Sequence, residues 1–150
     1  MATNRVYLDA CCLNRPFDDQ SQSRIRLESE AVLLIMARLQ SGEWLWLSSE
    51  AIDYEVGQTP DPEKRRRVEV LASASHQFIS LTSAVVSQAK KLQILGFKQW
   101  DALHLACAEQ GQADIFLTTD DKLLRLAQRV ADQLQVRVDN PLTWLEEVTE

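Results

Sequence analysis

The alternation of short apolar runs with longer amphipathic segments is the feature that most limits the fold of this chain. Five runs have the length and composition of buried strands, and they lie at residues 5–10, 43–49, 76–82, 113–119 and 136–138. Strands that are joined through helices predict a parallel sheet covered on both faces, with right-handed crossovers. We therefore expect an α/β fold with three layers and a central, mainly parallel sheet of about four or five strands.

Helical spacing of apolar residues fills most of the chain between these runs. The expected helices cover residues 23–42, 49–57, 61–75, 83–96, 98–111 and 120–135, with a final turn or short helix at 140–148. Residues 11–22 read as a polar loop. Because the sequence has no internal repeat, no low-complexity segment and no Gly/Ser linker, residues 1–150 are expected to form a single domain.

Composition excludes several classes of protein. Hydrophobic residues make up 45% and charged residues 25% of the chain, an ordinary balance for a globular protein. No apolar run approaches the roughly 20 residues that span a bilayer, and the N-terminus lacks the pattern of a signal peptide. The three cysteines, Cys11, Cys12 and Cys107, fit reduced thiols in the core of a cytoplasmic protein.

Two of the apolar runs end in acidic residues. Residues 5–8 lead directly into Asp9, and residues 113–119 lead into Asp120 and Asp121. In open parallel sheets, functional groups collect outside the carboxyl ends of the strands. We therefore expect Asp9 and Asp120 to face one shared crevice.

Two further acids occupy comparable positions. Asp101 lies among apolar residues near the start of the helix at 98–111, and Glu55 follows the second strand by a few residues. Each has an ordinary alternative, since Asp is common in the first turn of a helix and Glu is common on a solvated helix face. The functional interpretation depends on Asp9, Glu55, Asp101 and Asp120 sharing one edge of the sheet.

Three or four carboxylates that converge without histidine or cysteine form a hard, oxygen-only site suited to Mg²⁺ or Mn²⁺ rather than zinc. Ions of this kind catalyse phosphoryl chemistry, and without them the carboxylates would repel one another. The four glycines build no phosphate-binding loop, and no nucleophile elbow is present. His76 and His104 are isolated in the sequence; packing is the expected role of both, and His104 is also a candidate accessory because it lies one turn after Asp101.

The order of these motifs resembles a PIN-domain ribonuclease, in particular the VapC-type toxin of type II toxin–antitoxin pairs. The resemblance rests on Asp9 after the first strand, Glu55 after the second, and the segments "DALHLACAE" and "ADIFLTTDD". It implies a Mg²⁺- or Mn²⁺-dependent endoribonuclease, a hydrolase with Asp9, Glu55, Asp101 and Asp120 as catalytic residues and metal ligands. The candidate accessory residues are Asp121, Asn14, Arg15 and Thr119. One departure is Cys11, where the family often has Ser or Thr.

Partners and alternatives follow from the same reading. RNA is the expected substrate although the net charge is −6, because two divalent ions would supply roughly four positive charges. Arg15 and the basic run at 63–67 are the candidates for phosphate contacts. Apolar residues around the helix at 23–42 predict a homodimer, and the resemblance implies a small antitoxin protein and no membrane. Two alternative functions remain. One is a non-catalytic PIN-like module that binds RNA or protein, and the other is a receiver-like or phosphatase domain.

Overall fold

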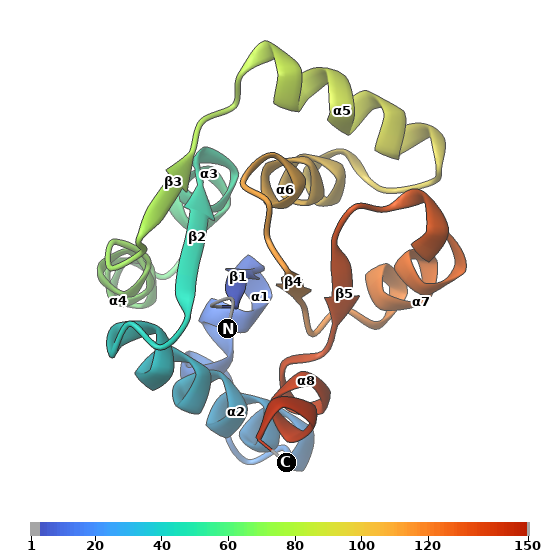
Figure 1. The fold of residues 1–150 in the computed structure, drawn as a ribbon. Helices are drawn as coiled ribbons and strands as arrows, with labels where there is room; N and C mark the ends of the chain where they lie inside the picture. The colour runs from blue at the N-terminus through green and yellow to red at the C-terminus, as the bar shows by residue number, and fades with distance from the viewer. Residues whose placement is uncertain (1–3, 150) are drawn as a thin grey trace.

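The computed structural model describes residues 4–149 and contains one five-stranded sheet (Figure 1). The strands are β1 (Arg5–Leu8), β2 (Leu45–Ser49), β3 (Gln77–Ile79), β4 (Ile115–Leu117) and β5 (Arg137–Asp139). Their order in the sheet is β3-β2-β1-β4-β5, and every neighbouring pair is parallel. The predicted α/β fold with a parallel central sheet is therefore confirmed, and each of the five strands lies where the sequence placed one.

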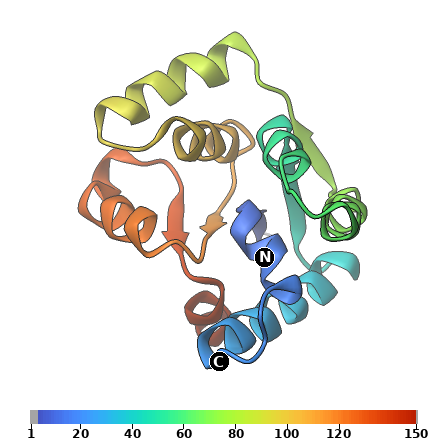
Figure 2. The same cartoon turned by 180° about the vertical axis from the view of Figure 1, so that it is seen from behind.

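Helices connect the strands and surround the sheet (Figures 1 and 2). They are α1 (Ala10–Asn14), α2 (Ser23–Gln40), α3 (Glu50–Gly57), α4 (Pro62–Ala72), α5 (Ser83–Ile94), α6 (Gln99–Gln110), α7 (Asp121–Arg129) and α8 (Pro141–Val148). In both views α5 and α6 lie side by side at one end of the picture, and α2 with α8 lies at the opposite end. The strands run between these two groups. None of the helices among residues 4–149 is both long and apolar enough to cross a membrane.

The segment after β1 differs from the loop that the sequence predicted. Residues 10–14 form the short helix α1, and residues 15–17 continue as a 3-10 turn. Asp9 caps α1, because its side chain accepts the N–H of Ala10. The helix is only five residues long, too short to show a helical pattern of apolar residues.

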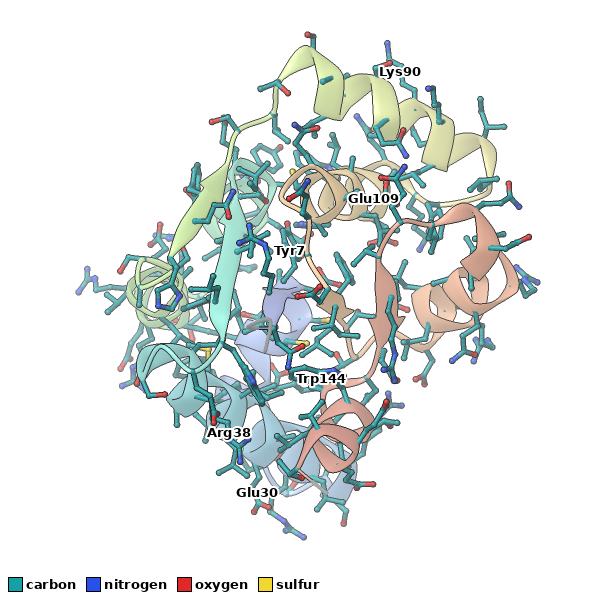
Figure 3. All side chains as sticks on the ribbon, in the orientation of Figure 1. Tyr7, Glu30, Arg38, Lys90, Glu109 and Trp144 are labelled. Atoms are coloured by element: carbon teal, nitrogen blue, oxygen red, sulfur yellow. The ribbon has the colours of Figure 1, made fainter. Side chains whose placement is uncertain are left out.

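The core lies on both sides of the central strand. Val6, Tyr7 and Leu8 of β1 are almost wholly buried, as expected for a parallel strand with helices on both faces. The ring of Tyr7 stacks on that of Phe116 in β4, with centroids 5.2 Å apart, and Figure 3 shows Tyr7 in the interior of the molecule. Residues 102–108 of α6 are all buried, so this helix is enclosed by its neighbours. Asp101 and His104 therefore project from one of the most enclosed helices of the fold.

Gly111, which ends α6, is fixed by close packing. A Cβ atom at this position would overlap the side chain of Leu47 and lie 3.0 Å from Cδ1 of Ile79. Its carbonyl oxygen also accepts a hydrogen bond of 2.7 Å from the guanidinium of Arg5. The end of α6 is thus pressed against β2 and β3, which fixes the height of the helix over the sheet.

We expect Gly111→Ala to destabilise the protein by about 1–3 kcal/mol, because core side chains must shift to admit the methyl group. Gly57→Ala is the matched control, since a Cβ there has no atom within 4 Å and alanine favours the helix. Urea denaturation followed by circular dichroism measures both. Equal stability of the two variants would contradict the packing described here.

Candidate functional site

Asp9 occupies the carboxyl end of the central strand and is only 5% exposed. Its Oδ1 accepts the N–H of Ala10 at 2.8 Å, and its Oδ2 accepts the hydroxyl of Thr118 at 2.9 Å. Cys11 Sγ lies 3.5 Å from the same Oδ2 and 3.3 Å from the Thr118 hydroxyl. The register between β1 and β4 pairs Leu8 with Leu117, which brings Thr118 next to Asp9. The sheet itself therefore fixes this carboxylate.

Two residues from different helices complete a compact cluster with Asp9. Glu55 comes from α3 and His104 from α6, and one ligand atom of each of the three residues lies within 4.8 Å of the others. His104 Nε2 is 2.9 Å from Glu55 Oε1 and 4.0 Å from Asp9 Oδ1. The Nε2 atom of the imidazole thus lies near both carboxylates, closer to Glu55 than to Asp9.

A chain of hydrogen bonds orients the imidazole from behind. Ser49 Oγ lies 2.7 Å from the Tyr7 hydroxyl, which lies 2.8 Å from His104 Nδ1. The Glu55 carboxylate can only accept, so Nε2–H of His104 donates to it. In the neutral imidazole Nδ1 then carries no proton and accepts from the Tyr7 hydroxyl. That leaves Ser49 Oγ, which accepts the N–H of Ile52, to donate its own proton to the Tyr7 oxygen.

Asp101 and Asp120 lie outside this cluster of three residues. Together with Lys98 and Lys122 they line a cleft of about 80 Å³. Asp120 caps α7, where its Oδ1 accepts the N–H groups of Lys122 and Leu123. The charges of Asp9, Asp120 and Glu55 all act on Asp101. The structure thus brings the four acids predicted from the sequence to one edge of the sheet.

The electrostatics of the cluster match this crowding. Burial and the neighbouring acids raise the pKa of Asp101 to about 6. Burial is also the main cause of the raised pKa of Asp9. Burial disfavours a charged imidazole at His104, but the hydrogen bond to Glu55 and the surrounding carboxylates raise the pKa of His104 overall. Asp9 and Asp101 are therefore each held close to other acids that oppose their ionisation, an arrangement that a cation would stabilise.

The four candidate accessory residues have different surroundings. Asp121 makes two hydrogen bonds of 2.8 Å to Arg24, which leaves Asp120 as the acid that faces Asp101. Arg15 pairs with Asp18 and Glu28, so its guanidinium is already neutralised. Asn14 has a buried Oδ1 with no hydrogen-bond partner in the described part of the chain. The backbone carbonyl of Thr119 accepts from Arg24.

Two residues of the site differ from the sequence-based expectation. The hydroxyl that reaches Asp9 belongs to Thr118, which was not among the candidate residues, whereas its neighbour Thr119 was a candidate accessory. His104, for which we expected packing and considered an accessory role, is in direct contact with Glu55. The signal for His104 was its position one turn after Asp101 on an apolar helix. Nothing in the sequence distinguishes Thr118 from Thr119 without the strand register.

The donor set fits a hard divalent cation. Carboxylate oxygens predominate, as Mg²⁺ and Mn²⁺ require, and one imidazole nitrogen lies beside them. Asp9 and Glu55 would hold the ion, and the charges of both act on Asp101. Zinc is a poorer match, because it favours nitrogen and sulfur ligands, whereas two of the three ligating residues in this cluster are carboxylates.

Comparison with known proteins gives two findings. The sequence family described as "PIN domain" matches residues 6–129. The fold is similar to one chain of the crystal structure of VapBC2 from Rickettsia felis bound to a DNA fragment from their promoter. That similarity has a TM-score of 0.60 at 13% sequence identity, and covers 91% of this chain and 98% of the other. No curated protein sequence matches significantly.

The hydrogen bond from His104 to Glu55 is testable with two isosteric variants. Glutamine places an amide near the position of Nε2, whereas asparagine places one near Nδ1. We expect His104→Gln to retain most Mn²⁺ affinity and His104→Asn to lose about 10–100-fold, because only the first can still orient Glu55. Isothermal titration calorimetry measures both affinities. Equal losses would show that His104 acts on the metal site through packing alone.

Proposed function

We propose that this chain, which belongs to the PIN-domain family, is a metal-dependent endoribonuclease that acts in the cytoplasm. The observation that carries the proposal is the cluster of Asp9, Glu55 and His104, together with the cleft lined by Asp101 and Asp120, whose charges act on each other. The reaction is hydrolysis of RNA phosphodiester bonds. A bound Mg²⁺ or Mn²⁺ ion would supply Lewis-acid activation of the phosphodiester and of water.

The acidic residues of the chain would have different roles in this reaction. Asp9, fixed by Thr118 and by the Ala10 N–H, offers a carboxylate that does not have to move. The side chain of Glu55 is 41% exposed and is oriented by the hydrogen bond to His104. It is therefore the more accessible of the two carboxylates. Asp101, with a pKa of about 6, loses its proton near neutral pH and is then available as a ligand or as a base.

A protein partner is the second part of the proposal. The fold is similar to that of a chain in the VapBC2 assembly, and we propose by analogy that this chain is the toxin of a type II toxin–antitoxin pair. A small antitoxin protein would then bind it and block cleavage. The support here is likeness of fold, so the partner is identified by co-purification with the product of the adjacent open reading frame.

Replacing Asp9 or Asp101 with asparagine should slow RNA cleavage about a thousandfold, equivalent to about 4 kcal/mol of transition-state stabilisation. The amide keeps the size of the side chain and removes the charge that holds a cation. Cleavage of a varied RNA pool in Mg²⁺ or Mn²⁺ is compared with cleavage in EDTA. Asp132→Asn, at an exposed acid that belongs neither to the cluster nor to the cleft, is the control.

Three outcomes separate the hypotheses. Cleavage that survives EDTA, or an unaffected Asp101→Asn protein, would contradict the metal-dependent mechanism. A parent protein that binds the RNA pool but leaves it intact with every acid present would instead identify a non-catalytic binding module. Loss of cleavage in both variants, with Asp132→Asn active, is the expected result.

We also propose a homodimer formed through α2. Val32, Ile35 and Met36 of this helix are buried in the core, but Leu27, Leu33 and Leu34 are about half exposed. Leu27 and Leu34 are seven residues apart, so they lie on the same face of the helix. An exposed pair of leucines on a long helix favours a second apolar surface against it.

The double variant Leu27→Lys/Leu34→Lys should be monomeric at micromolar concentration, while the parent has twice the 17.1 kDa mass of one chain. Light scattering after gel filtration measures both. Ile94→Lys is the control, because Ile94 is 85% exposed on a different helix. A monomeric parent would refute the dimer.

A further inference from the structure

The basic residues of this chain differ sharply in whether an acid neutralises them. Most ion pairs of the described residues use the arginines and lysines of the N-terminal half, as in Arg15–Glu28, Arg24–Asp121, Lys64–Asp18 and Arg67–Glu63. In the basic run at 63–67, Arg65 also donates to the carbonyl of Thr59. The run that looked most suited to phosphate in the sequence is therefore largely occupied by contacts within the protein.

Helix α7 carries the opposite arrangement. Lys122, Arg125 and Arg129 are exposed, and within residues 4–149 none of them has an acidic oxygen at ion-pair distance. Their spacing of three and four residues places them on one face of the helix. We call these three residues the α7 stripe. The opposite face of α7 is anchored by the buried residues Leu123 and Ala127, so the backbone that carries the cations is packed against the core.

The α7 stripe begins at the acidic site. Lys122 lines the cleft that contains Asp101 and Asp120, with Lys98 beside them. An open hollow of about 540 Å³ then continues along the helix, lined by Lys122, Arg125, Gln128 and Arg129. Lys122 belongs to both, so one cation joins the site to the hollow. The stripe spans about 10 Å at 1.5 Å per residue, roughly three nucleotides of a stacked strand at 3.4 Å each.

We propose that the α7 stripe binds the phosphate backbone of the RNA substrate and leads the strand to the acidic site. Three unpaired cations in a row have the charge and spacing to neutralise successive phosphates. Contacts of this kind carry no sequence information, so the stripe supplies affinity and direction while selectivity arises elsewhere. This inference rests on the proposed nuclease function and names the surface that holds its substrate.

The test compares two triple variants that remove the same number of positive charges. Lys122→Ala/Arg125→Ala/Arg129→Ala removes the stripe. Lys90→Ala/Lys91→Ala/Arg26→Ala removes two exposed lysines and one exposed arginine that also lack ion pairs among the described residues. These control residues lie on α5 and α2, and Figure 3 shows Lys90 pointing outward from α5. Both variants change the net charge equally.

Affinity for a labelled single-stranded RNA pool of about 16 nucleotides is measured by fluorescence anisotropy between about 50 and 200 mM KCl. The measurements use the Asp101→Asn background, so that the RNA stays intact. The stripe variant should bind about tenfold or more weakly, and the slope of log K against log salt should fall by about 2, at roughly 0.7 per lost phosphate contact. The control variant should keep the parent slope. Equal losses in the two variants would overturn the proposal.

Cleavage by the same variants with Asp101 restored separates this proposal from the proposed function. A stripe variant that cleaves RNA with an unchanged KM would leave the nuclease standing and overturn the stripe. A raised KM with little change in kcat supports the stripe. A parent that neither binds nor cleaves RNA would end both. Binding of a poly-glutamate peptide to the stripe as tightly as RNA would identify a protein-docking face and also overturn the proposal.

Discussion

The candidate site depends on the position of one buried carboxylate, that of Asp9. β1 is the middle strand of five, so its carboxyl end lies at the centre of the edge where open parallel sheets place their ligands. Strand pairing puts Thr118 beside Asp9, and the Ala10 N–H holds the other oxygen. Because the sheet fixes Asp9, the helices α3 and α6 must be packed so that Glu55 and Asp101 lie near this carboxylate. The close packing of Gly111 against β2 and β3 serves that requirement.

Gathering acids in this way has a cost in stability that depends on pH. The pKa of Asp101 rises from an ordinary value of 3.8 to about 6, so the folded state favours the neutral carboxyl. For a raised pKa, that contribution to stability is fully present below the ordinary value and is lost as the pH rises through about 6. Without a cation, the site therefore weakens the fold at neutral pH. A divalent ion removes the repulsion, which couples metal binding to stability.

Strands β1 and β4 with Asp9 and Asp120 could be predicted because each pair is a local signal, an apolar run followed within a few residues by Asp. The helix at 10–14 could not, since five residues carry no periodic signal and the Asp9 cap is shared with the site. The contact of Thr118 with Asp9 depends on strand register, a relation between segments over 100 residues apart. Arg15 was a reasonable phosphate ligand in the sequence, but Glu28, 13 residues away, neutralises it in the fold. Pairing between distant charges is the part of the site that local pattern does not contain.

That pairing also explains how a chain with a net charge of −6 could bind RNA. Net charge sums over every residue, whereas an approaching phosphate responds to charges within about a Debye length, roughly 8–10 Å in physiological salt. The opposite charges of an ion pair largely cancel in the field that a phosphate feels at that distance. What remains near the site is of two kinds: acids crowded around Asp9, which favour a divalent cation, and the cations of the α7 stripe. They meet at the cleft where Lys122 stands beside Asp101 and Asp120. A metal-dependent nuclease needs those two fields next to each other, and a positive total is not required to produce them.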